Sequence, residues 1–269
     1  MIKKRKKSYA VVTGASSGIG MEFARRLVAE GYNIILSGRR SDRLNQLSDE
    51  LKVTGADIIV IEADLSKIDN CKVFMSKILK YKISVFINNA GFGDCGYFMD
   101  TDVNKELSMI DVNIKAVHFL TKTMLLKMDM QGGGYILNVA SSAGLIPAGP
   151  YMATYYATKS YVTSLTRAIA RELEEHDSPI YIGCLCPGPV DTEFNQVANV
   201  EFALKGISAS YCVDYAIAQM KKRQTVIIPT LRMKMLSVCG RFIPQKIYIN
   251  LTGRQQKKKL GVDADALMR

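Results

Sequence analysis

Tyr155 and Lys159 are the pair of side chains whose types and spacing best suit proton transfer. They lie four positions apart in a helical run from Thr154 to His176, so they share one face of that helix. A free tyrosine titrates at about 10 and is a slow acid or base at neutral pH, whereas a neighbouring ammonium stabilises the phenolate and lowers that value. The spacing alone is common on helix surfaces, so its meaning depends on the rest of the chain.

A glycine-rich run, Thr13-Gly14-Ala15-Ser16-Ser17-Gly18-Ile19-Gly20, joins a β-branched segment to a helical one. Gly14 permits a tight turn, Gly18 permits close approach of a phosphate, and Gly20 lets the helix pack on the sheet. The N-terminus of the helix offers free N–H groups and the positive end of its dipole. The run therefore predicts a site for the pyrophosphate of a dinucleotide, with an ordinary loop as the alternative.

Two arginines end the next β-like segment, which reads Ser37-Gly38-Arg39-Arg40. Enzymes that use NAD usually have an acidic residue here that holds the ribose hydroxyls, whereas guanidinium groups match a 2′-phosphate. Since this end has Arg39 and Arg40 and no carboxylate, we expect NADP(H) as the cofactor. A pair of solvated arginines at a turn is the alternative.

Short apolar runs alternate with helical runs along the chain. The expected strands are 10–13, 33–37, 58–61, 84–87, 135–139, 180–184 and 225–228, and the expected helices are 19–30, 42–52, 68–81, 103–128 and 154–176. Most strands are apolar on both faces, which is typical of a parallel sheet covered by helices. The alternation predicts an α/β fold with a doubly wound parallel sheet of about seven strands, whose ligands bind beyond the carboxyl ends of the strands.

Taken together, these patterns resemble the short-chain dehydrogenase/reductase family over roughly 7–229, through the TGxxxGxG turn, Asn88-Asn89-Ala90-Gly91 and Tyr155-x-x-x-Lys159. The resemblance implies a Rossmann fold and hydride transfer between a nicotinamide and a carbonyl or secondary alcohol. It implies that Tyr155 is the general acid/base and that Lys159 lowers its pKa and holds the nicotinamide ribose. Asn113 would anchor a water in the proton relay.

The resemblance also assigns cofactor contacts beyond the glycine-rich turn. They follow the ends of later strands: Asp64 with Leu65 near the adenine, Asn89, Ala90 and Gly91 after the fourth strand, and Pro187, Gly188, Val190 and Thr192 around the nicotinamide carboxamide.

The serine that hydrogen-bonds the substrate oxygen is Ser141 or Ser142. The family's usual spacing to the tyrosine selects Ser142, whereas alignment on Asn138 and Gly144 selects Ser141. We favour Ser141, because the strand end fixes its position and the later loop can absorb an extra residue.

The length of 269 residues, 48% of them hydrophobic, suits one Rossmann-fold domain over 1–269. Within it we expect a substrate lid at 191–210, with an amphipathic segment from Phe194 to Leu204, and a basic amphipathic extension at 231–269. The apolar stripe with basic flanks in 231–251 suits an apolar substrate lid or interfacial anchor, with a helix packed on the sheet or on another subunit as the alternative. It resembles the tails of family members that act on steroids and fatty-acyl ketones, which implies an apolar substrate of that kind.

The net charge of +11 comes without a nucleic-acid reading motif, so no nucleic-acid partner is expected. A solvated surface is the ordinary interpretation of the charge, and contact with an anionic membrane or an acidic carrier protein is the alternative. No metal site is expected. The scattered cysteines and the lack of an apolar stretch after the cationic 1–7 segment predict a cytoplasmic protein, with peripheral association with a membrane as the alternative.

Apolar residues on the long helices, Val117, Leu120, Tyr161 and Leu165, suggest a homodimer or homotetramer, as the family resemblance implies. A non-catalytic NADP-binding sensor or scaffold on the same fold is the competing function. Intact Asn113, Ser141, Tyr155 and Lys159 argue for the enzyme.

Overall fold

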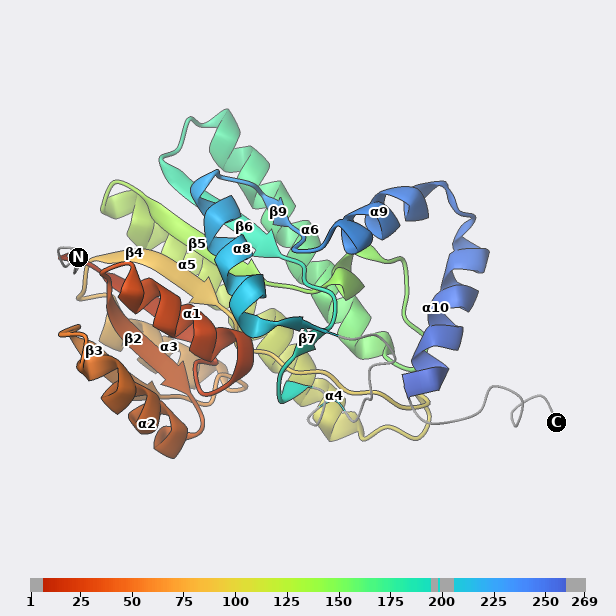
Figure 1. The fold of residues 1–269 in the computed structure, drawn as a ribbon, viewed down its shortest axis with the longest axis horizontal. Helices are drawn as coiled ribbons and strands as arrows, with labels where there is room; N and C mark the ends of the chain where they lie inside the picture. The colour runs from red at the N-terminus through yellow and green to blue at the C-terminus, as the bar shows by residue number, and fades with distance from the viewer. Residues whose placement is uncertain (1–6, 195–197, 199–205, 260–269) are drawn as a thin grey trace.

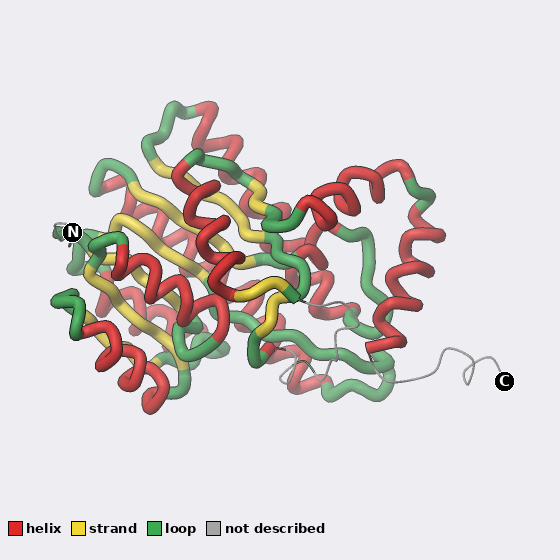
Figure 2. Tube along the Cα trace, in the orientation of Figure 1, coloured by secondary structure: helices red, strands yellow, loops and turns green. Residues whose placement is uncertain are grey.

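Seven parallel strands form the central sheet of the computed structural model, which describes residues 7–194, 198 and 206–259. They are β1 (Tyr9–Thr13), β2 (Asn33–Gly38), β3 (Ile58–Glu62), β4 (Ile83–Asn88), β5 (Gly134–Val139), β6 (Ile180–Leu185) and β9 (Val226–Ile227). Their order is β3-β2-β1-β4-β5-β6-β9, with every described pair parallel. The predicted doubly wound sheet is confirmed (Figures 1 and 2).

Helices cover both faces of this sheet. On one face, α1 (Gly18–Ala29), α2 (Ser41–Lys52) and α8 (Ala209–Lys221) bury apolar side chains such as Phe23, Leu44 and Val213. On the other face lie α3 (Ile68–Ile78), α5 (Val117–Met130) and α6 (Ala153–Glu175). Both sets of contacts are apolar and fully buried, which explains why the strands are apolar on both sides.

The expected helix over 103–128 is divided in the structure. It begins as α4 (Val103–Ile110), passes through a π-helical segment (Asp111–Ala116) and continues as α5. Such π-helical turns occur frequently at functional sites, and this one carries Asn113.

The strand order runs from β1 through β2 to β3 on one side and continues with β4 on the other side of β1. The direction of winding therefore reverses between β1 and β4, where such folds have a crevice at the carboxyl ends of the strands. A small parallel pair, β7 (Val190–Asp191) with β8 (Ile207–Ser208), lies near this end. The turn from β1 into α1 and the ends of β4, β5 and β6 all reach the same edge.

Two helices stand away from the sheet and form what we call the C-terminal arm, residues 231–259. The arm contains α9 (Leu231–Cys239) and α10 (Gln245–Lys259), shown in blue in Figure 1. Several of its large apolar side chains are exposed: Leu231, Met235, Leu236, Val238, Phe242, Ile247 and Leu251. Most of the predicted lid segment 194–204, and residues 260–269 of the predicted extension, lie outside the described residues.

The expected subunit-interface residues divide into two groups. Val117 and Leu120 are buried within the protomer, so their assignment to an interface is wrong. Both face α6 or the sheet because α5 packs there with its whole apolar stripe. Tyr161 and Leu165 are half-buried.

None of the helices in the described part of the chain is both long enough and apolar enough to cross a bilayer.

Candidate active site

A cavity of about 870 Å³ opens at the carboxyl ends of the strands. Among the predicted cofactor residues, Gly20 is the one that does not line its wall. The opposite wall is largely apolar and includes side chains from the C-terminal arm, among them Met233, Leu236, Ile243 and Leu251. The predicted cofactor residues and this largely apolar wall therefore line one cavity. The part of the cavity beside that wall is called the apolar chamber below.

The glycine-rich turn is built so that backbone, not side chain, faces the cavity. Gly14 and Gly18 have φ of +64° and +54°, and a Cβ on Gly14 would stand 2.9 Å from Ala90 Cα. The α1 helix begins at Gly18 without a side-chain cap or an acidic residue in its first turn, so its free N–H groups and positive dipole end remain available to an anion. This cradle fits the pyrophosphate of a dinucleotide.

Gly20 acts one layer behind that cradle. A Cβ there would meet the Gly14 carbonyl oxygen at 2.3 Å and Asn89 Nδ2 at 2.5 Å. The close approach is thus between α1 and the turn itself rather than between α1 and the body of the sheet.

Asn89 and Thr13 tie the turn to the end of β4. Asn89 Nδ2 donates to the carbonyl oxygens of Thr13 (2.9 Å) and Gly14 (3.2 Å). The Thr13 hydroxyl accepts from the backbone N–H groups of Asn89 (2.9 Å) and Ala90 (3.0 Å). The amide of Asn89 therefore positions the backbone of the glycine-rich turn. Asn89 also lines the cavity, and its predicted direct contact with the cofactor stays a prediction.

The two arginines after β2 have different surroundings. Arg39 is exposed on the cavity wall. Arg40 is within 3.4 Å of the Ser16 hydroxyl and forms an ion pair with Glu193 at 2.9 Å.

Asp64, predicted near the adenine, accepts from the N–H and hydroxyl of Ser66 through Oδ1 at 3.1 and 2.9 Å, so one carboxylate oxygen is used to shape the loop after β3.

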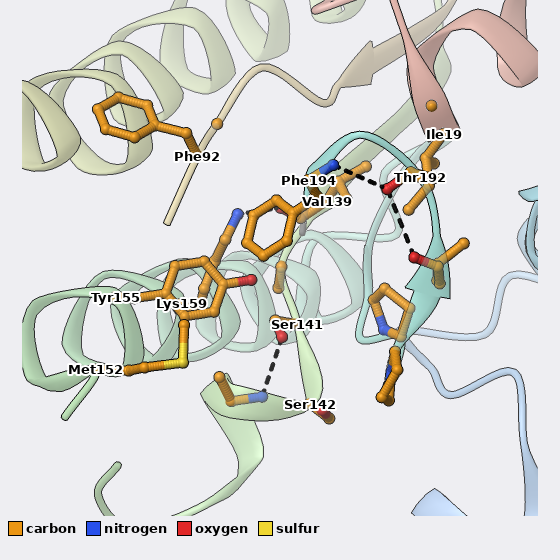
Figure 3. Close-up of a pocket in the computed structure, with 18 of the residues that line it drawn as sticks. Ile19, Phe92, Val139, Ser141, Ser142, Met152, Tyr155, Lys159, Thr192 and Phe194 are labelled. Carbon is orange, nitrogen blue, oxygen red and sulfur yellow. Dashed lines mark hydrogen bonds between the residues drawn. The ribbon is translucent and has the colours of Figure 1, made fainter. Parts of the chain in front are cut away.

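Tyr155, Lys159 and Ser141 meet where the cofactor edge joins the apolar chamber (Figure 3). Lys159 Nζ donates to the Val139 carbonyl at 2.9 Å and lies 5.8 Å from the centre of the Tyr155 ring. The Ser141 hydroxyl accepts from the N–H of Ala143 at 3.1 Å, and its proximity to Tyr155 lowers the pKa of that phenol. Ser142 also lines the cavity, and its N–H donates to the Pro187 carbonyl at 2.8 Å. Ser141 is the serine that acts on the pKa of Tyr155, which favours Ser141.

Burial dominates the ionisation of this group. It raises the pKa of Tyr155 to about 12, against the smaller lowering effect of the nearby Ser141. Burial also lowers the pKa of Lys159 to about 8. The direction for Tyr155 is opposite to the one expected from the Tyr-x-x-x-Lys spacing, because loss of water around the phenol outweighs an ammonium that faces the ring rather than the hydroxyl. In this state Tyr155 is a neutral proton donor.

Asn113 is fully buried and does not line the cavity. Its Oδ1 accepts from the Phe92 N–H at 3.1 Å, and its Nδ2 donates to the Phe92 carbonyl at 2.8 Å and to Thr158 Oγ1 at 3.1 Å. A Cβ on Gly91 would stand 2.9 Å from Asn113 Oδ1 and 3.3 Å from Lys159 Nζ. Asn113 therefore holds the Gly91–Phe92 backbone against α6, beside the lysine.

Sequence reasoning gave no individual role to several cavity residues, although some of them fall in the predicted lid or extension. They are Phe92, Val112, Ile146, Met152, Tyr156, Glu193, Arg232, Tyr248, Thr252, Arg254, Gln255 and Gln256. Isolated apolar side chains in loops carry no motif, so Ile146 and Met152 gave no signal. Phe194, expected in the lid, packs its ring 5.5 Å from that of Tyr155. Tyr156 is buried and accepts a hydrogen bond from Gln256 Nε2 at 2.6 Å.

Comparison with known proteins gives this geometry a context. Residues 8–201 match the family model described as short chain dehydrogenase. The 17-beta-hydroxysteroid dehydrogenase type 3 of Rattus norvegicus is 28% identical over 251 residues, which cover 91% of this chain and 79% of the rat protein.

Two solved structures share the fold. A short-chain dehydrogenase from Sphingobium yanoikuyae in complex with NADPH is 27% identical, with a TM-score of 0.79 over 88% of this chain and 97% of that one. A short-chain dehydrogenase/reductase from Burkholderia phymatum in complex with NAD is 23% identical, with a TM-score of 0.80 over 93% and 96% of the two chains. By its sequence match and its seven-stranded sheet, this chain belongs to the short-chain dehydrogenase family of oxidoreductases.

Proposed function

We propose that this protein is an NADP(H)-dependent oxidoreductase that interconverts a carbonyl and a secondary alcohol on an apolar substrate, with Tyr155 as general acid/base. The observation that carries the proposal is the position of the Tyr155 hydroxyl. It lies on the wall of the cavity together with Ser141, Lys159, the glycine-rich turn and the apolar side chains, and Ser141 is close enough to lower its pKa.

When bound, the nicotinamide supplies or takes up the hydride. Tyr155 then gives its proton to the oxygen that becomes the alcohol, and its raised pKa keeps it protonated for that step. Ser141 orients the substrate oxygen through its hydroxyl. Lys159 supplies a buried positive charge beside the ring, and Asn113 positions the Gly91–Phe92 backbone next to it. Lys159 and the glycine-rich turn would hold the ribose and the pyrophosphate.

NADP(H) is favoured over NAD(H) by Arg39 and Arg40 at the end of β2, where guanidinium groups can meet a 2′-phosphate. The NADPH complex of the Sphingobium relative is consistent with this choice. Wild-type protein should therefore show a higher kcat/KM with NADPH than with NADH, and equal values would contradict the assignment.

The apolar wall supports a bulky or long-chain ketone or alcohol. Phe92, Ile146, Met152 and Phe194 form one apolar cluster with the tyrosine. The C-terminal arm adds apolar side chains such as Leu236 and also polar ones such as Arg232 to the cavity wall. The name of the rat relative, a hydroxysteroid dehydrogenase, fits a substrate of this kind. Profiling NADPH oxidation over ketones of increasing apolar size would test it, and a preference for small polar ketones would contradict it.

The exposed side chains of the protein support proposals about its assembly and its location. A homodimer or homotetramer through the surface of α5 and α6 would use Tyr161 and Leu165, which remain partly accessible. Residues 231–259 carry cationic and apolar side chains and no carboxylate side chain, which suits contact between the C-terminal arm and an anionic membrane surface or acidic carrier of a cytoplasmic enzyme.

The test of the catalytic assignment is Tyr155→Phe, which keeps the ring and its packing on Phe194. Turnover should fall by about 10²-fold or more, the range for loss of a general acid, while NADPH affinity stays nearly unchanged. Tyr161→Phe on the same helix is the control, because Tyr161 bonds His118 and is outside the cavity wall. NADPH binding without turnover in the wild type would favour the sensor or scaffold, and an active Tyr155→Phe variant would turn attention to Tyr156.

A further inference from the structure

Glu193 is the feature of the cavity that neither the family motifs nor the proposed mechanism explains. It follows β7 and lies on the cavity wall, about 150 residues along the chain from the arginines that it contacts. Its Oε2 pairs with Arg40 at 2.9 Å and its Oε1 with Arg43 at 2.6 Å. Both oxygens of one carboxylate are thus bound by guanidinium groups of the segment after β2.

The two arginines hold the carboxylate in its charged form. Their hydrogen bonds lower the pKa of Glu193, so it stays ionised at neutral pH. The three side chains are each about 40% exposed, at 42%, 41% and 37% for Arg40, Arg43 and Glu193. Ion pairs with this exposure contribute little to stability, so a stronger anion can displace the carboxylate.

A 2′-phosphate is such an anion. Its oxygens and those of a carboxylate use the same guanidinium donors, and two anions at one guanidinium repel each other. Without a 2′-phosphate, as with NAD(H), Glu193 has no competitor and can keep its partners.

We propose that Glu193 is a specificity-determining residue that occupies the 2′-phosphate position on Arg40 and so weakens the preference of this protein for phosphorylated cofactors. The inference rests on the proposed role of Arg40 in NADP(H) binding. Glu193 must release Arg40 when NADPH binds, which lowers the affinity for NADPH without affecting NADH.

The test is Glu193→Gln, which keeps the size of the side chain and removes its charge. Dissociation constants for NADPH and NADH, and for adenosine 2′,5′-bisphosphate and ADP as fragments, are measured by titration calorimetry at low salt. Affinity for the two ligands with a 2′-phosphate should increase about three- to tenfold, as expected for removal of a partly exposed competing ion pair. Affinity for NADH and ADP should change less than about twofold.

Glu50→Gln is the matched control, because Glu50 pairs with Arg25 on the outer surface, away from the cavity. An unchanged or lowered ratio of NADPH to NADH affinity in Glu193→Gln would overturn the inference, since Glu193 would then be neutral or would orient the arginines for the phosphate. The proposed use of NADP(H) is judged separately, by the ratio in the wild type and its loss in Arg40→Gln.

Discussion

The cavity has two halves that are built in different ways. The cofactor half consists of backbone at the ends of β1, β2 and β4, where glycines allow close approach and Thr13 and Asn89 bond the turn from behind. The substrate half consists of side chains from separate segments, including α9, in which no described side chain is buried. The cofactor half depends on glycines, where a Cβ would collide with backbone, whereas the substrate half depends on the side chains that line it.

This difference indicates which changes each half tolerates. Added atoms in the cofactor half collide with backbone, which cannot move without disturbing the sheet. Changed side chains in the substrate half alter shape and polarity at an exposed surface, where the protein can adjust. The contacts that anchor α10 to the rest of the fold, such as Gln256 to Tyr156, are few in comparison with those of the sheet.

Among the changes that compare the two halves, the largest effect on stability and cofactor binding together is expected from Gly20→Ala, which disrupts the cofactor half. Its Cβ would stand 2.3 Å from the Gly14 carbonyl oxygen, so α1 and the turn must separate. We expect a loss of stability of about 1–3 kcal/mol and at least about tenfold weaker NADPH binding. Chemical denaturation and calorimetry measure both.

Gly55→Ala is the control for that change, because a Cβ there meets nothing within 4 Å although φ is +76°. It should cost stability through backbone strain alone, about 1 kcal/mol, and leave the affinity for NADPH unchanged. Normal cofactor binding by a folded Gly20→Ala variant would contradict the close-packed cradle.

A pH profile examines the junction of the two halves. Burial lowers the pKa of Lys159 to about 8, so its positive charge is present below pH 8 and is lost as the pH rises through that value. Tyr155, with a pKa raised to about 12, stays protonated over the same range. The kcat/KM for ketone reduction should therefore fall by about tenfold per pH unit above about pH 8.

Lys159→Arg identifies the group responsible for that decrease. Arginine keeps its charge throughout, so this variant should lose the decrease even if its maximal rate is lower. If the same decrease persists in Lys159→Arg, the titrating group is not Lys159.

The smallest effect is expected from Leu236→Ser in the C-terminal arm, which changes the substrate half alone. Leu236 lines the cavity, so KM for a bulky apolar ketone should rise about three- to tenfold, with NADPH affinity unchanged. Val238→Ser, two residues away and outside the cavity wall, is the control. Equal KM values for the two variants would remove the arm from the substrate half.

The cofactor half was the more predictable because its function depends on residues that few others can replace. A left-handed φ at Gly14 and Gly18, or a paired Tyr155 and Lys159 on one helical face, leaves a recognisable pattern in the chain. Val117 and Leu120 were misassigned to an interface because an apolar helical stripe looks alike whether it meets the sheet or another subunit. The contact of Glu193 with Arg40 had no signal, although Glu193 falls in the predicted lid at 191–210, since one glutamate in a loop is indistinguishable from a solvated one.

The amino-acid sequence by itself determined the parallel sheet, its alternating helices and the edge at which the motif residues gather, because period, glycine placement and strand polarity are local properties. Tertiary structure alone decided which distant groups meet there. It brought Glu193 to Arg40, the C-terminal arm to the chamber, and enough surrounding protein to Tyr155 to raise its pKa. These are effects of burial and of contact between segments, and neither is encoded in the spacing of neighbouring residues.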